Sequence, residues 1–270
     1  MLNYTRRSVP EDKDHIFQCA IDWAMEAGRI QLDKFRSRRR LAMTTKSSLH
    51  DIVTEVDEAC ETLLIGKINE TFPGHSIVGE ETGVHKRNSD WEWVLDPLDG
   101  TTNYSQGLPI FSVSIGVKYK GETQVGVVYI PFMDEVFAAK RGEGATWNGR
   151  SIHVSRKTDL NQCVCGTGFP YDKGSNSDNN LDNLSVLLPH LRGIRRMGSA
   201  AYDLCCVASG MLDAYWELNL KPWDVCAGAL IVEEAGGVVR SFREDRDISI
   251  VAGSEKLVDK VMSLMQTVRK

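Results

Sequence analysis

The spacing of apolar residues changes along this chain from helical to alternating. That change limits the folds that the chain can adopt. Near the N-terminus they recur at helical spacing in two stripes, at 15–35 and 56–68. In the middle of the chain they alternate, which predicts antiparallel strands at 113–119, 124–130 and 135–139. Further helices are predicted at 200–210, 225–235 and 255–267. Because helices and strands alternate throughout, we expect an α+β fold of layered helices and sheets.

Size and composition narrow the class of protein. The chain has 270 residues, 42% of them hydrophobic, and a net charge of -5. We expect one unit over residues 1–270, with a weakly marked subdivision near residue 150. The weakly acidic composition argues against nucleic-acid binding. No apolar run is long enough to span a bilayer and the polar N-terminus lacks a signal peptide, so we expect a cytoplasmic protein. The seven cysteines form no C-x-x-C pair and are interpreted as small buried hydrophobes.

The segment 93–103 carries the strongest chemical signal. An apolar strand leads directly into Asp96 and Asp99, with Pro97 stiffening the turn between them. Gly100 lets the backbone approach a ligand, and the threonines that follow stand where a helix could start and favour a phosphate. Magnesium prefers carboxylates together with phosphate oxygens. The plain alternative is a strand followed by an ordinary turn, because Asp, Gly and Thr are common in turns.

Other acidic residues stand at the ends of predicted elements. They are Glu80 and Glu81 after a short strand, Asp51 and Asp57 at the second helix, and Asp224 at the start of a later helix. Each alone could be a helix cap, which stabilises a helix by about 1 kcal/mol. If these acids converge without a cation, their repulsion raises their pKa values or destabilises the fold. A bound cation resolves that conflict.

Taken together, these segments resemble the motifs of the inositol monophosphatase family. The matching stretches, in the family's order and at its spacing, are 51–57 (DIVTEVD), 79–81 (GEE), 96–103 (DPLDGTTN), 198–201 (GSAA), 213–217 (DAYWE) and 222–224 (PWD). The resemblance extends from about the first predicted helix to the last. It is specific for the superfamily and less so for the substrate. It implies a layered α-β-α-β-α sandwich of the inositol monophosphatase and fructose-1,6-bisphosphatase type.

The resemblance also implies a centre of two to three Mg²⁺ ions. The first ion would be held by Glu80, Asp96 and the backbone carbonyl of Leu98. The second would be held by Asp96, Asp99 and Asp224, and a weaker third ion would depend on Glu80 and waters. Glu80 therefore counts both as a metal ligand and as a catalytic residue. A metal lowers the pKa of bound water, so this chemistry needs no histidine base.

The same resemblance assigns residues to the substrate. Thr101 would pair with Asp57 and orient the attacking water, while phosphate would lie over the N–H groups of Gly100 and Thr101. The implied contacts to the rest of the substrate are Asp99, Gly198, Ser199, Ala200 and Glu217. Glu217 would accept hydrogen bonds from substrate hydroxyls, against the alternative of an exposed strand-end acid. Lys46 matches a family lysine near the metal site.

The implied activity is hydrolysis of a small phosphorylated polyol, with inositol monophosphate as the leading substrate. Fructose 1,6-bisphosphate, histidinol phosphate and adenosine 3′,5′-bisphosphate are the related alternatives. A second phosphate would need cations, for which Arg192, Arg195 and Arg196 are candidates. A non-catalytic binding protein that kept the fold is the alternative from another class, and it predicts loss of a metal carboxylate. The resemblance further implies a homodimer and inhibition by lithium.

Overall fold

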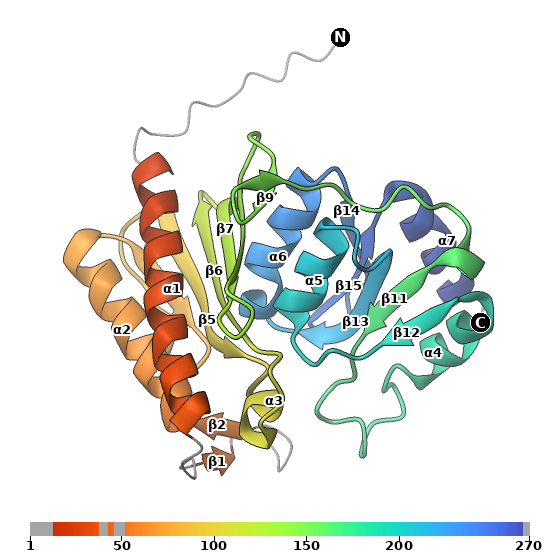
Figure 1. The fold of residues 1–270 in the computed structure, drawn as a ribbon, viewed down its shortest axis with the longest axis horizontal. Coiled ribbons are helices and arrows are strands. Elements are labelled where there is room, and N and C mark those ends of the chain that lie inside the picture. Colours follow the sequence, from red (N-terminus) through yellow and green to blue (C-terminus); the bar gives the residue numbers. More distant parts are fainter. Residues whose placement is uncertain (1–12, 38–42, 46–51, 267–270) are drawn as a thin grey trace.

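A computed structural model of the chain describes residues 13–37, 43–45 and 52–266. Its helices are α1 (Lys13–Ser37), α2 (Glu55–Thr71), α3 (Thr101–Gln106), α4 (Leu181–Leu187), α5 (Ala200–Ala208), α6 (Pro222–Glu234) and α7 (Glu255–Met265). Helices and sheets form five layers (Figure 1). From left to right these are α1 with α2, an eight-stranded sheet, α5 with α6, a five-stranded sheet, and α4 with α7. The predicted α-β-α-β-α sandwich is confirmed.

The larger sheet has the strand order β10-β9-β8-β7-β6-β5-β3-β4. Its strands are β3 (Ser76–Gly79), β4 (Gly83–His85), β5 (Trp91–Asp99), β6 (Ser112–Tyr119), β7 (Glu122–Ile130), β8 (Glu135–Lys140), β9 (Ala145–Trp147) and β10 (Arg150–Ser151). Neighbouring strands are antiparallel, except that β3 runs parallel to β5. The three strands predicted from alternation are β6, β7 and β8, which form a meander. A separate ribbon of β1 (Met43–Thr45) and β2 (Ile52–Thr54) precedes α2.

Helix α1 covers the larger sheet with the stripe that predicted it. Its buried apolar residues include Ile16, Ala20, Trp23 and Ala27. At Gly28 an added Cβ would lie 2.5 Å from the ring of Tyr129 on β7, so a side chain here would push the helix away from the sheet. Removing such a stripe from water contributes about 25 cal/mol for each Å² of apolar surface buried.

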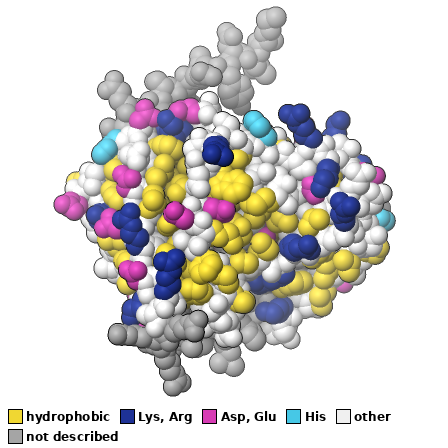
Figure 2. Space-filling view, viewed as in Figure 1, with side chains coloured by type: hydrophobic (Ala, Val, Ile, Leu, Met, Phe, Trp, Pro, Cys, Tyr) yellow, Lys and Arg dark blue, Asp and Glu magenta, His cyan; other side chains and the backbone are white. Residues whose placement is uncertain are grey.

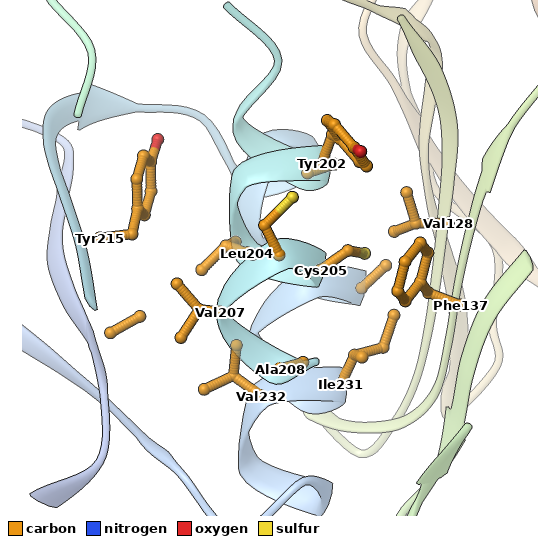
Figure 3. Packing of buried hydrophobic residues seen from close by; sticks show 14 of the residues in the cluster. Val128, Phe137, Tyr202, Leu204, Cys205, Val207, Ala208, Tyr215, Ile231 and Val232 are labelled. Atoms are coloured by element: carbon orange, nitrogen blue, oxygen red, sulfur yellow. The ribbon is translucent and has the colours of Figure 1, made fainter. Parts of the chain in front are cut away.

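Helices α5 and α6 fill the space between the two sheets. Figure 3 shows Leu204 and Cys205 of α5 with Phe137 of the larger sheet on one side and Tyr215 of the smaller sheet on the other. A Cβ at position 126 on β7 would lie 2.6 Å from the carbonyl oxygen of Ala227, so a glycine there lets α6 contact the strand directly. The middle layer therefore holds both sheets at a fixed separation.

The smaller sheet has the strand order β12-β11-β13-β15-β14. Its strands are β11 (Val164–Thr167), β12 (Gly193–Arg195), β13 (Ala214–Leu220), β14 (Val238–Arg243) and β15 (Ile248–Gly253). Strand β11 is parallel to β12 and β13, and the remaining pairs are antiparallel. Helices α4 and α7 cover its outer face through a buried cluster that includes Leu187, Trp216 and Val258. The larger sheet ends at Ser151, close to the subdivision near residue 150, which stays a prediction.

The surface of the molecule carries both apolar and charged side chains. Figure 2 shows apolar side chains spread over the centre of one face, with lysines and arginines frequent on its right half. All seven cysteines are free, and six are buried as predicted. Cys19 is half-buried on α1, so the prediction of a buried residue is wrong there. None of the helices in the described part of the chain has the length and apolar character needed to cross a membrane.

Candidate active site

A cavity of about 800 Å³ is lined by residues of both sheets and of the helices between them. All the residues predicted to bind metal line it: Glu80, Asp96, Leu98, Asp99 and Asp224. The predicted substrate contacts also line it: Asp99, Gly100, Thr101, Gly198, Ser199, Ala200 and Glu217. Lys46 lies outside the described residues. The fold therefore collects segments that are far apart in the sequence into one recess.

The local structure of β5 explains how Asp96 and Asp99 reach the same cavity. The expected strand end before Asp96 is wrong, because β5 continues through Asp99. Asp96 pairs with Ser114 and Asp99 with Ser112, so β5 has one more residue than β6 between these pairs. Residues three apart in a regular strand point to opposite faces, and this bulge brings both carboxylates to one side.

Hydrogen bonds hold this bulge in place. The N–H of Leu98 donates to Asp96 Oδ1 at 3.0 Å. Gln31 of α1, which is fully buried, donates from Nε2 to the carbonyl oxygen of Pro97 at 2.7 Å. Both bonds satisfy backbone groups that the irregular strand leaves without ladder partners.

Asp99 and Asp224 are each fixed by the start of a helix. Asp99 Oδ2 accepts from Ser199 Oγ at 2.7 Å and from the N–H of Ala201 at 2.8 Å, at the N-terminus of α5. Asp224 Oδ2 accepts from the N–H of Lys221 at 2.7 Å, at the N-terminus of α6. The capping alternative therefore holds for Asp224, which still lines the cavity.

Burial raises the pKa values of these acids. The pKa of Asp96 lies well above its usual range because of burial first, and then because of the charges of Glu80, Asp99 and Asp224. The pKa of Asp224 is raised by burial and by the charge of Asp99. For Asp99, burial raises the pKa against the opposing effect of its hydrogen bonds. The acids thus repel one another in the way the sequence predicted.

Glu80 stands on a turn that a second glutamate organises. Glu61 of α2 is fully buried and accepts hydrogen bonds from the N–H groups of Glu81 and Thr82, at 2.8 Å and 2.9 Å. A Cβ at position 79 would lie 2.1 Å from Glu61 Oε1, so a glycine there lets the carboxylate reach the turn. Glu61 therefore orients the chain that presents Glu80 to the cavity.

Thr101 and Asp57 meet as expected. Thr101 Oγ1 lies 3.1 Å from Asp57 Oδ1 and 3.0 Å from the carbonyl oxygen of Leu98. Asp57 also accepts from the N–H and the hydroxyl of Thr54, at 2.9 Å and 2.6 Å, which caps α2. Burial raises the pKa of Asp57 despite these bonds.

Glu217 of β13 occupies another part of the cavity wall. Tyr215 donates a short hydrogen bond from its hydroxyl to Glu217 Oε2. A Cβ at position 168 would lie 2.0 Å from that carboxylate, so a glycine makes room for it. Burial raises the pKa of Glu217 to about 7. Glu217 is thus a partly buried member of the cavity wall, and the alternative of an exposed strand-end acid is wrong.

Comparison with known proteins identifies the family. A model of the inositol monophosphatase family matches residues 12–269. The chain belongs to the inositol monophosphatase family. Nus factor SuhB of Pasteurella multocida is 42% identical over 252 residues, which cover 92% of this chain and 94% of that protein. The structure of suhB from Bartonella henselae matches with a TM-score of 0.87 and 35% identity, covering 93% of this chain and 98% of that one. Inositol monophosphatase from Anabaena sp. PCC 7120 matches with a TM-score of 0.83 and 36% identity, covering 94% and 96%.

The donors in this cavity fit magnesium. In the described part of the chain, no three His, Cys, Asp or Glu side chains are placed so that they could hold a metal ion together. The chemistry and the charge of the donors in the cavity nevertheless suit magnesium. Carboxylate and carbonyl oxygens are the ligands that Mg²⁺ takes, and Asp96, Asp99 and Asp224 form no ion pair with a described basic side chain. A divalent cation would offset the repulsion that adds to burial in raising the pKa values of Asp96 and Asp224.

Two residues that support this site were not predicted from the sequence. Gln31 stands four residues after Ala27, so it continues the apolar stripe of α1 as a polar residue. Glu61 stands four residues after Asp57 on the buried side of α2. A polar residue at a buried helical position is the signal that could have found both.

Proposed function

We propose that the chain is a magnesium-dependent phosphomonoesterase that hydrolyses a small phosphorylated polyol, with inositol monophosphate as the leading substrate. One observation carries the proposal. Asp96, Asp99 and Asp224 are gathered in one open cavity without an ion pair to any described lysine, arginine or histidine. A site that concentrates negative charge in this way is suited to a cation, and a substrate phosphate then completes the cation's oxygen ligands.

Each acid has a role in this proposal. Glu80, Asp96 and the carbonyl oxygen of Leu98 would hold one ion, while Asp96, Asp99 and Asp224 would hold a second. Bound magnesium supplies charge neutralisation, a water of lowered pKa and stabilisation of the leaving alkoxide. The Thr101 hydroxyl, fixed between Asp57 and the carbonyl oxygen of Leu98, orients the attacking water.

The remaining cavity residues bind the substrate. Phosphate lies over the N–H groups of Gly100 and Thr101, where the backbone of Gly100 has a φ of 94° that favours glycine. Glu217 and the backbone of Gly198, Ser199 and Ala200 contact the hydroxyls of the leaving alcohol. Lys46 stays a candidate for a position near the metal ions.

The cations of the cavity favour a monophosphate over a bisphosphate, because one of them, Lys221, already pairs with Asp247 at 2.6 Å. Arg196 lines the cavity, whereas Arg192 and Arg195 are not among its lining residues. A second phosphate would therefore meet one of the three candidate arginines. This ranks fructose 1,6-bisphosphate and adenosine 3′,5′-bisphosphate below inositol monophosphate.

Phosphate release from purified protein tests the proposal. We expect magnesium-dependent release from inositol 1-phosphate, with slower release from histidinol phosphate and the two bisphosphates. A chelator abolishes release and added magnesium restores it. Lithium inhibits the reaction, as the family resemblance implies. Release that continues unchanged in the chelator would refute the metal-dependent reaction.

The family resemblance also supports a homodimer. Phe132 and Met133, with exposed fractions of 43% and 40%, supply apolar surface for a second copy to cover. Sedimentation equilibrium of the purified protein measures its mass, and we expect that of two chains.

The name of the relatives favours a second candidate function. The protein of Pasteurella multocida is called a Nus factor, a role that its name states without reference to hydrolysis. The present chain keeps Glu80, Asp96, Asp99 and Asp224, which favours a working phosphatase. An Asp96→Asn variant separates the two functions, because a role independent of hydrolysis survives the loss of that carboxylate.

A further inference from the structure

Asp203 of α5 is a buried acid without a partner. Its side chain accepts no hydrogen bond and forms no ion pair among the described residues, and its Oδ1 atom is shielded from solvent. The residue is 1% exposed, yet it lines the same cavity as Glu217 and Asp99. Buried carboxyl groups are normally hydrogen-bonded, so an exception that borders a ligand cavity needs an explanation.

Two glycines make room for two carboxyl groups in this part of the cavity. A Cβ at position 166 on β11 would lie 3.0 Å from Asp203 Oδ1. A Cβ at position 168, just beyond the end of β11, would lie 2.0 Å from Glu217 Oε2. Residues two apart on a strand point to the same side, so both glycines clear space along one face. The chain thus keeps side chains out of the space that Asp203 and Glu217 occupy.

A structural role in starting α5 does not account for Asp203. An acid in the first turn of a helix is stabilised by the helix dipole. However, the capping bond of α5 is already made by Ser199, whose Oγ accepts from the N–H of Tyr202 at 3.3 Å. An exposed acid would give the same dipole stabilisation without the cost of burial.

The charges around Asp203 suit a neutral polar ligand group. Burial and the charge of Glu217 raise the pKa of Asp203 well above its usual range, while Arg196 on the cavity wall opposes the shift. A carboxyl group that keeps its proton both donates and accepts hydrogen bonds. A substrate hydroxyl does the same, so the two groups are complementary.

We propose that Asp203 is a second substrate-recognition residue beside Glu217 and that it binds a hydroxyl group of the leaving alcohol. The inference rests on the proposed phosphatase function. It narrows the substrate to phosphate esters of alcohols with at least two further hydroxyl groups, one for each carboxyl group. Esters of simple alcohols leave Asp203 unpaired and are therefore poor substrates.

Two substrates and two variants test this proposal. Inositol 1-phosphate has a hydroxyl-rich leaving group, whereas 4-nitrophenyl phosphate has none. For Asp203→Ala we expect kcat/KM for inositol 1-phosphate to fall about 10- to 100-fold, mainly through KM, while the value for 4-nitrophenyl phosphate stays within about twofold. Asp203→Asn keeps a donor and an acceptor, so it should retain most of the activity on inositol 1-phosphate. Asp182→Asn, which removes an exposed first-turn acid from α4, is the matched control and changes neither value.

Equal losses on both substrates, or no loss on either, would overturn the role of Asp203. If the wild-type protein releases phosphate from neither substrate with magnesium, the proposed function fails and this inference fails with it. Should Asp203→Ala not fold, Asp203→Val keeps the volume without either oxygen and is compared in the same way. Thermal unfolding adds a separate readout. Removing an unpaired buried carboxyl group should not lower the Tm of the Asn variant, whereas a purely structural role predicts that it does.

Discussion

Two buried acidic regions of this protein balance their charge differently. Just before β13, Asp213 accepts hydrogen bonds from the side chains of Ser155 and Lys157 and from the N–H of Val164, so the protein itself supplies its partners. In the cavity, Asp96 and Asp224 face other carboxylates, and those charges add to the effect of burial on their pKa values. Both regions belong to stretches that match family motifs. Membership of a motif therefore does not separate structural acids from site acids, whereas an ion pair with a basic side chain does, since Asp213 has one and Asp99 and Asp224 have none among the described residues.

The sharpest test of this contrast is the removal of one acid from the cavity. We expect Asp96→Asn to lower kcat for inositol 1-phosphate by roughly 10³-fold or more, because both proposed magnesium positions use this carboxylate. The fold should survive, since the substitution removes a source of repulsion. Phosphate release gives kcat, and circular dichroism checks the fold. Near wild-type turnover would contradict the assignment of the site.

Magnesium and pH should affect stability together. The raised pKa values of Asp96, Asp99 and Asp224 mean that the metal-free folded state holds more protons than the unfolded state. Stability is then greatest at acid pH and falls as pH rises through the raised values. In a chelator we expect the Tm to decrease as the pH rises above the ordinary pKa of an aspartate side chain. Magnesium at 100 times its Kd should add about 2.7 kcal/mol, and at a fixed magnesium concentration the gain should increase with pH.

Scanning calorimetry across that pH range, with and without magnesium, measures both effects. Sodium chloride at equal ionic strength is the control for a general salt effect. A Tm in chelator that rises steadily with pH would show that these acids are not held in mutual repulsion.

Removing Asp213, the acid whose partners the protein supplies, should lower the stability of the fold and leave kcat almost unchanged. Asp213→Ala leaves the N–H of Val164 and the hydroxyl of Ser155 without their acceptor, which should cost about 2 kcal/mol of unfolding free energy. Urea denaturation measures this loss. In the folded fraction, kcat should change far less than in Asp96→Asn. A stable but inactive Asp213→Ala protein would reverse the assignments of the two regions.

The smallest effect on stability is expected from replacing Lys157, the lysine that pairs with Asp213. The Lys157 side chain is 42% exposed, so its ion pair with Asp213 is screened by solvent. We expect Lys157→Gln to cost about 0.5 kcal/mol, also measured by urea denaturation. A loss as large as that of Asp213→Ala would mean that the ion pair, and not the two hydrogen bonds, stabilises this region.

Helical and alternating spacing predicted the helices and the central strands, because these patterns are local. The order of the layers and the residues of the cavity came from the resemblance to the inositol monophosphatase family, since spacing alone does not show that Asp96, Asp99 and Asp224 meet. The bulge in β5 was not predicted, because it depends on pairing with β6 and on Gln31 of α1. The roles of Glu61 and Asp203 were not predicted either, because each depends on a glycine in a strand that is distant in the sequence.

The cavity draws on residues made early and late during synthesis of the chain. Glu80 and Asp96 belong to the first hundred residues, whereas Asp224 lies on α6, and β13 with Glu217 pairs with β15 near the C-terminus. A growing polypeptide thus holds only part of the cavity until α6, β13 and β15 have formed and docked. Any activity of the cavity would therefore report that both sheets and the helices between them have assembled.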